Sequence, residues 1–176
     1  KIIHYKNGIP YQIEEEKRTT ILNNIPETLD FLNDEDLIPH PKFNILSDAI
    51  NRDGHKTYYS NGKVETNSFK QDGNHVTYEF DLNGNPHTII FDDKLIKIGK
   101  NHFCIIENNN NVEKETFYNW DDGSVHVSHL KDNKHKAISF HNGKVSSYIQ
   151  SINGKGFFAE FNQDGSLKDY SELVEV

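Results

Sequence analysis

Nine of the eleven glycines in this 176-residue chain directly follow Asn or Asp. Asn-Gly and Asp-Gly are strong signals for a two-residue type I′ β-turn, because both central residues of that turn need a positive φ. The pairs are Asn7-Gly8, Asp53-Gly54, Asn61-Gly62, Asp72-Gly73, Asn83-Gly84, Asp122-Gly123, Asn142-Gly143, Asn153-Gly154 and Asp164-Gly165. The sequence therefore predicts a string of β-hairpins.

Four of the turns share the pattern aromatic-x-(Asn/Asp)-Gly-x-(Val/Pro). A two-residue loop places the aromatic directly opposite the valine, and an aromatic beside a β-branched residue is a favourable cross-strand pair. The pairs expected are Tyr59 with Val64, Trp120 with Val125 and Phe140 with Val145. Two further copies, at Asn83-Gly84 and Asp164-Gly165, carry one extra residue and need a bulge or a wider loop.

A two-residue loop at Asp132-Asn133 extends the pairing over three strands. One face of this stretch is then apolar and holds Val125, Val127, Ile138, Phe140 and Val145. The other face is polar and holds His126, Ser128, Ala137, Ser139 and His141. Such alternation is typical of an antiparallel meander with one buried face.

The spacing of the glycines indicates a repeat. Gly62, Gly73 and Gly84 are eleven residues apart, and so are Gly143, Gly154 and Gly165. Two strands with two turns then form a unit of 22 residues, and units at a fixed period predict a repeat architecture. Between these two series, the Asp92-Asp93 pair and the run of asparagines from 108 to 111 are plausible turn points.

Three segments carry a resemblance to known repeat families. "YYSNGKV" at 58–64 and "SFHNGKV" at 139–145 resemble MORN-type repeats, in particular those of bacterial YwqK-like antitoxin modules. "YEFDLNGNPHTIIF" at 78–91 is similar to the YD repeats of Rhs-type toxin shells. The first resemblance implies a MORN-like sheet and a partner of the antitoxin or immunity type.

Residues 11–50 do not fit the hairpin pattern. We expect an N-terminal strand, a short helix over residues 26–33 and a second helix or a strand over residues 43–50. Because a one-layer sheet needs a cover over its apolar face, we expect residues 20–50 to pack there. The division predicted is therefore a covering segment, 1–50, and a hairpin sheet, 51–176.

Composition excludes several classes of function. The net charge of −8 and the absence of a basic patch argue against nucleic acid and anionic membranes as partners. The sequence has no apolar run near 18 residues, so no membrane span is expected. Cys104 is the one cysteine, is expected to be a buried inert thiol, and favours a cytoplasmic over an oxidising compartment. A chain that begins at Lys1 is also compatible with a signal peptide removed upstream.

Candidate site residues are few, and no catalytic motif is present. His126 and His141 share the polar face, but the strand pairing places no Cys, Asp or Glu beside them as a third ligand. We therefore predict no metal and no cofactor. Tyr118 and Trp120 are the large aromatics best suited to anchor a partner, and these two residues with His126 and His141 form the predicted binding set.

The predicted fold is all-β: an antiparallel meander of about ten to twelve strands with a short helical segment near the N-terminus. Repeated hairpins offer an extended surface, which favours a non-catalytic protein–protein interaction module, antitoxin-like or immunity-like by resemblance. One alternative is a structural part of a larger assembly such as a toxin shell, a phage particle or a cell surface, with self-association through sheet edges. Another is a carbohydrate-binding or hydrolytic protein that uses the polar face.

Overall fold

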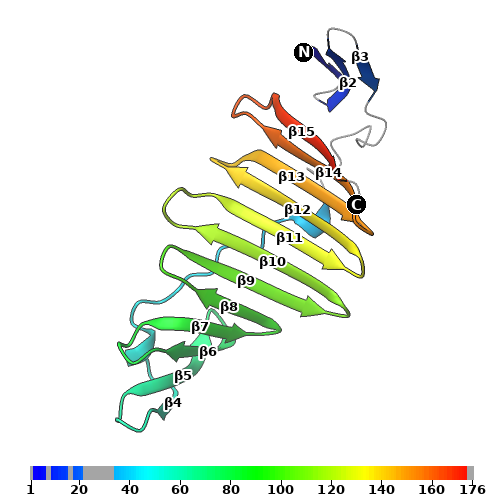
Figure 1. Cartoon of the computed structure of the whole chain (residues 1–176). Coiled ribbons are helices and arrows are strands. Elements are labelled where there is room, and N and C mark those ends of the chain that lie inside the picture. Colours follow the sequence, from blue (N-terminus) through cyan, green and yellow to red (C-terminus); the bar gives the residue numbers. More distant parts are fainter. Residues whose placement is uncertain (1, 7–8, 16–17, 22–33, 174–176) are drawn as a thin grey trace.

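A computed structural model describes residues 2–6, 9–15, 18–21 and 34–173 of the chain, with side chains for residues 34–172. The described chain is all-β, and its main element is a twelve-stranded antiparallel sheet in which each strand pairs with its neighbours in sequence (Figure 1). The strands are β4 (His55–Tyr58), β5 (Val64–Gln71), β6 (Asn74–Phe80), β7 (Pro86–Phe91), β8 (Lys94–Ile98), β9 (His102–Asn109), β10 (Val112–Asn119), β11 (Val125–Lys131), β12 (Lys134–His141), β13 (Lys144–Ile152), β14 (Lys155–Phe161) and β15 (Leu167–Leu173). The predicted antiparallel meander is confirmed, and β4 and β15 are its two edges.

The N-terminal region contains more strands than the single one predicted. β1 (Ile2–Lys6), β2 (Ile9–Glu15) and β3 (Arg18–Ile21) form a separate three-stranded antiparallel sheet. The helix predicted for residues 26–33 lies outside the described residues. In the described part of residues 34–54, helical structure is confined to two 3₁₀ turns, η2 (Glu35–Leu37) and η3 (Ala49–Asn51).

Two kinds of turn alternate along the main sheet. At one end of the strands, each two-residue loop has a first residue with positive φ: Asp72, Asp92, Asn110, Asp132 and Asn153. At the other end, the loops after β4, β6, β10 and β14 are longer, and a glycine near the end of each takes the positive φ: Gly62, Gly84, Gly123 and Gly165. Two hairpins at this end differ: Asn142-Gly143 forms a two-residue β12–β13 loop with both φ values positive, and the β8–β9 loop, residues 99–101, has no residue with positive φ.

The type I′ prediction is thus confirmed at Asp72-Gly73, Asn142-Gly143 and Asn153-Gly154 and is wrong at Asn61-Gly62 and Asp122-Gly123, where the loops are longer. In three of the longer loops the side chain before the glycine accepts a backbone N–H; for example, Asn61 Oδ1 accepts the Lys63 N–H at 3.0 Å, and Asp164 Oδ1 accepts the Ser166 N–H at 2.8 Å. In the loop after β6, Asp81 Oδ1 instead accepts the N–H groups of Asn83 and Asn85. This arrangement leaves only glycine in the left-handed region, as in three-residue hairpin loops. Asp53-Gly54 precedes β4 and joins no hairpin, whereas Asn7-Gly8 lies outside the described residues.

The longer loops also shift the register of two predicted pairs. Phe140 faces Val145 as expected, but Val64 faces Tyr58 rather than Tyr59. Val125 faces Tyr118, because Trp120 lies in the loop itself. The wider loops expected at Asn83-Gly84 and Asp164-Gly165 are present, with a register shift in each adjoining hairpin.

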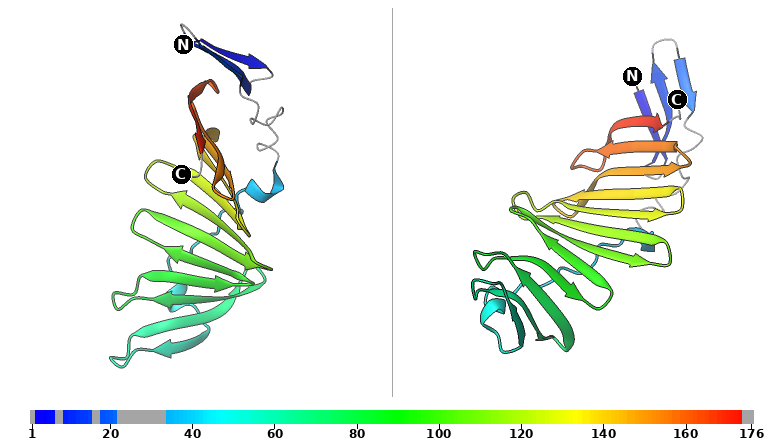
Figure 2. Two further views of the ribbon diagram at one scale, coloured as in Figure 1. Left: turned by 45° about the vertical axis from the view of Figure 1, so that its right-hand side comes forward. Right: turned by 60° about the horizontal axis from the view of Figure 1, so that its bottom comes forward.

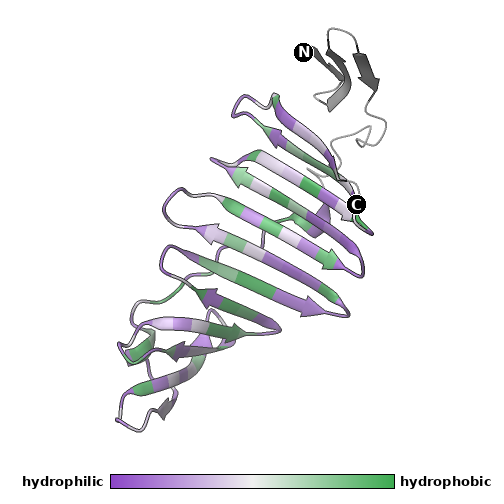
Figure 3. Ribbon diagram, in the orientation of Figure 1, coloured by the Kyte–Doolittle hydropathy of each residue, from purple (hydrophilic) through white to green (hydrophobic). Residues whose placement is uncertain are grey.

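One face of the sheet carries the core. Its central row runs through directly paired residues from β5 to β15: Asn67, Tyr78, Ile89, Ile96, Ile105, Thr116, Val127, Ile138, Tyr148, Ala159 and Tyr170. Val127 and Ile138 are buried and directly paired, as predicted from the loop at Asp132-Asn133. The alternation of apolar and polar residues can be followed along the strands in Figure 3.

The core face is covered by residues 34–52, here called the strap. The strap crosses the strands and reaches β5 before the chain enters β4 at the edge (Figures 1 and 2). Its contacts follow the strand order: Asp34 pairs with Lys136 on β12, the His40 N–H donates to Thr116 on β10, and Phe43 packs on Phe91 of β7. The cover predicted for the apolar face is confirmed for residues 34–50.

The β5 and β6 end of the strap is held by side chains that bind its backbone. Asn67 donates its amide to the carbonyls of Ala49 and Arg52, both at 2.9 Å. The Tyr78 hydroxyl accepts the Leu46 N–H and donates to Gln71 Oε1. These bonds pair strap backbone groups without any strand pairing of the strap itself, whereas Asn67 Oδ1 is buried with no hydrogen-bond partner among the described residues.

Substitution of Gly156 tests the packing of the β13–β14 hairpin. A Cβ at this position would lie 1.7 Å from the Gln150 carbonyl oxygen, so the backbones would have to separate. We expect Gly156→Ala to lower the free energy of unfolding by about 3 kcal/mol or more. Gly143→Ala is the control, since a Cβ there meets nothing within 4 Å and only the positive φ opposes it, at about 1 kcal/mol. Equal urea midpoints for the two variants would contradict this packing.

Candidate functional site: the open face and the charged row beneath the strap

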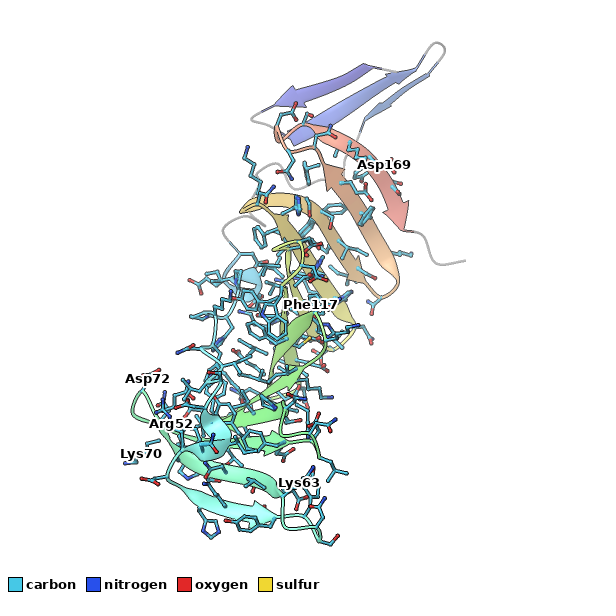
Figure 4. All side chains as sticks on the ribbon, turned by 90° about the vertical axis from the view of Figure 1, so that its left-hand side faces the viewer. Arg52, Lys63, Lys70, Asp72, Phe117 and Asp169 are labelled. Carbon is cyan, nitrogen blue, oxygen red and sulfur yellow. The ribbon has the colours of Figure 1, made fainter. Side chains whose placement is uncertain are left out.

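The face opposite the strap carries a row of paired side chains that includes three stacked or edge-packed rings. His102 stacks on Phe117 with ring centroids 4.7 Å apart, and Phe117 meets His126 edge-on at 5.6 Å. His126 Nδ1 lies 2.5 Å from Ser139 Oγ on the next strand. Figure 2 shows no described element over this side of the sheet, and Phe117 is labelled in Figure 4. We call this surface the open face.

His126 and His141 lie on neighbouring strands of the open face, as predicted. A third group that the pairing argument missed, Asp122, is within electrostatic reach of both imidazoles. Hydrogen bonds from the Ser124 hydroxyl and N–H lower the pKa of the Asp122 carboxyl, and the two histidines lower it further. Asp122 lies in a loop, so strand periodicity could not place it. Among the described residues, no group of three or more His, Cys, Asp or Glu side chains could hold a metal ion.

Cys104 lies in the same row, directly opposite Phe117. Its side chain is buried, and burial together with the nearby Glu115 raises the pKa of the thiol to about 12. The thiolate is the reactive form of cysteine, so this residue is inert at neutral pH. The expectation of a buried, unreactive thiol is confirmed.

Tyr118 and Trp120 belong to the other side of the sheet and do not join the two histidines. The Tyr118 ring stacks on Phe103 at 4.9 Å, and its hydroxyl donates to the carbonyl of His40 on the strap. Trp120 packs on the same Phe103 at 5.6 Å and keeps 44% of its surface exposed. The four residues predicted to bind together are therefore separated. Tyr118 contacts the strap, Trp120 is an exposed ring in a loop, and His126 and His141 lie on the open face.

A charged row that sequence reasoning missed crosses the core face under the strap. Its members are directly paired from β8 to β12: Lys94, Glu107, Lys114, His129 and Lys136. The strap supplies polar and charged partners to this row. Lys136 Nζ lies 2.6 Å from Asp34 and 2.7 Å from Asp36, and His40 Nε2 lies 3.5 Å from Glu107.

The protonation of this row follows from its burial and its partners. Burial lowers the pKa of Lys136, but the hydrogen bonds that its ammonium group donates to Asp34 and Asp36 outweigh burial and hold that pKa above its usual value. The Lys136 hydrogen bond in turn lowers the pKa of Asp36. Burial lowers the pKa of His129, and Asp36, at 3.6 Å from its Nε2, only partly opposes this shift. Lys136 and Asp36 are thus an ion pair at neutral pH, with a neutral imidazole beside it.

Comparison of the chain with protein-family models, with curated proteins and with solved structures gave no match. The resemblance to MORN-type repeats therefore stays a prediction. In the part of the chain that the structure describes, no helix has the length and apolar character needed to cross a membrane.

The buried imidazole predicts how stability depends on pH. Because the pKa of His129 is lowered on folding, the unfolded chain binds more protons at mildly acidic pH, and stability falls as pH drops below about 6.5. We expect His129→Gln to reduce the loss of unfolding free energy between pH 7.5 and pH 5.5. His75→Gln, an exposed change on β6, should leave the wild-type loss intact.

Urea unfolding of the three proteins at both pH values makes the comparison. If wild type and His129→Gln lose the same stability between the two pH values, His129 is not the group that titrates.

Proposed function

We propose that this chain is a non-catalytic protein-binding module and that the open face binds the partner. The observation that carries the proposal is the row His102, Phe117 and His126, a set of contacting rings on a sheet face that no described element covers. Aromatic side chains at the centre of a surface with polar groups around them are typical of protein interfaces.

The surroundings of the rings favour a broad, shallow contact. Small side chains occupy the neighbouring positions on β11 to β13, namely Ser128, Ala137, Ser139 and Ser147. A partner can therefore approach the backbone closely beside the rings. Ile90 on β7 also lies on the open face. It keeps 42% of its surface exposed and extends the apolar part of that face.

The edges of the sheet are less suited to assembly. β4 contains four residues, and β15 presents the charged Lys168, Asp169 and Glu172. Short edge strands and charged side chains on edges oppose pairing with another chain. The face, rather than an edge, is therefore the surface that we propose for binding.

The resemblance to YwqK-like modules gives the proposal a finer form. A module of that kind would bind a toxin-type protein and block its activity, as an immunity protein does. This part rests on the segments 58–64 and 139–145 alone.

A charge reversal on the open face tests the proposal. His126→Glu places a carboxylate beside Phe117, and His75→Glu makes the same change on β6, well away from the rings. The wild-type chain and both variants would be immobilised and exposed to an extract of the source cells. Proteins retained would then be quantified by mass spectrometry.

We expect at least one protein to be retained by wild type and His75→Glu and to be reduced about tenfold or more by His126→Glu, since a misplaced charge in an interface costs more than 1 kcal/mol. If His126→Glu retains every protein in the same amount as wild type, binding by the open face is contradicted. Inhibition of the retained protein's toxic activity would support the immunity form.

A further inference from the structure

The contact between η2 and the sheet resembles a bound peptide more than a packed element of the fold. Lys136 Nζ lies between the carboxylates of Asp34 and Asp36, at 2.6 and 2.7 Å, and only 7% of the Lys136 side chain is exposed. An ammonium group buried to this extent needs a counter-charge, because a buried unpaired charge is strongly destabilising. Whatever covers Lys136 must therefore bring carboxylates with it.

Beside the ammonium group is an apolar pocket for a single side chain. Leu37, which follows Asp36, keeps 2% of its surface exposed and packs with Val127, Ile138, Tyr148 and Phe157. A carboxylate pair next to a buried leucine is a compact recognition element: the charges fix position and orientation, and the leucine adds apolar burial. We call Lys136 and this pocket the socket.

Beyond η2 the strap continues in the manner of an extended ligand. The His40 N–H donates to Thr116 Oγ1 at 3.1 Å, and the Tyr118 hydroxyl donates to the His40 carbonyl. Both bonds join strap backbone to sheet side chains, so the strap adds no strand to the sheet. Side-chain contacts of this kind can be replaced one by one by a competing segment.

The socket is also accessible from solvent. Side-chain exposure is 24% for Asp34 and 49% for Asp36. Two surface depressions of about 510 and 470 Å³ border it, and Asp36, His129 and Lys131 line both. An incoming segment can therefore reach Lys136 before the strap has left completely.

We propose that the socket is a docking site for an acidic segment of a partner protein with the order Asp-x-Asp-Leu, and that residues 34–37 occupy it in cis as an exchangeable pseudo-ligand. The requirement for two carboxylates comes from Lys136, and that for leucine comes from the pocket. The apolar anchors of the strap near Ala49 keep their places during the exchange, so the rest of the core face stays covered. The site lies on the face opposite the open face and does not depend on the function proposed for that face.

Because residues 34–37 of the same chain occupy the socket, the apparent affinity of the socket for a segment of another protein is lowered. A tethered segment competes at an effective concentration on the order of 1 mM. The apparent affinity equals the intrinsic affinity multiplied by the fraction of chains whose socket is empty. Changes that weaken residues 34–37 without altering the sheet should therefore strengthen binding in trans.

The experiment uses the full chain and a fluorescent synthetic peptide with the sequence of residues 34–43. Two strap variants weaken the binding of residues 34–37 to the socket in different ways. The double variant Asp34→Asn/Asp36→Asn removes both carboxylates, and the single variant Leu37→Ala removes the buried leucine side chain. Circular dichroism confirms that each variant is folded, and having two routes keeps the test valid if one fails to fold. Lys136→Met, combined with Leu37→Ala, removes the charge of the socket. Lys134→Met in the same background is the control, since Lys134 is exposed on the same strand.

Fluorescence anisotropy should show the peptide binding to both strap variants with an apparent Kd at least about tenfold lower than for wild type. Lys136→Met should abolish this binding, and Lys134→Met should leave it unchanged. A peptide with Asn at both Asp positions and Ala for Leu should not bind.

Three results would overturn the proposal. They are no binding to either folded strap variant, binding that survives Lys136→Met, and equal binding of the altered peptide. Dimers of the full-length strap variants in light scattering, in place of peptide binding, would assign the socket to a second copy of the chain and overturn the partner segment.

Discussion

A sheet one layer thick must have one face covered, and the rest of this structure depends on that constraint. Residues alternate between the two faces along each of the twelve strands, so every second side chain of a strand points to the core face. Most of those in the central row are apolar and need a partner across the face. A second sheet or a set of helices usually supplies it. Here the strap does so with a chain that is largely extended and crosses the strands, which is why its contacts run in strand order from Lys136 to Asn67.

The cover is polar as well as apolar, and this explains the charged row in the middle of the core face. A lysine at position 136 would be costly beneath an apolar cover, because its desolvation needs a counter-charge. Asp34 and Asp36 supply it, and they also fix which part of the strap lies over β11 and β12. Ionic pairs of this kind specify a register more than they stabilise, and the same property makes the contact suitable for exchange.

Much of the fold could be predicted from local sequence because hairpins are local structures. Asn142-Gly143 fixes its own loop, and the loop fixes Phe140 against Val145. The pairings of Tyr59 and Trp120 were wrong for an equally local reason. The side chain of Asn61, and that of Asp122 in the other loop, accepts the backbone N–H of the residue two positions later and lengthens the loop.

Contacts of the strap could not be predicted in this way. Asp34 and Lys136 are separated by 102 residues, and no periodicity links them. Of the candidate site, His126 and His141 follow from strand alternation, whereas Asp122 and the ring row with His102 needed the register.

The most direct test of the account is whether residues 51–176 can exist without a cover. The fragment would be prepared alone and with a synthetic peptide of residues 34–52, and its mass and unfolding would be followed by light scattering and urea titration. We expect the fragment to associate when alone and to become a monomer with a cooperative unfolding transition when the peptide is added. A fragment that is monomeric and unfolds cooperatively without the peptide would contradict the claim that the strap is the cover on which the sheet depends.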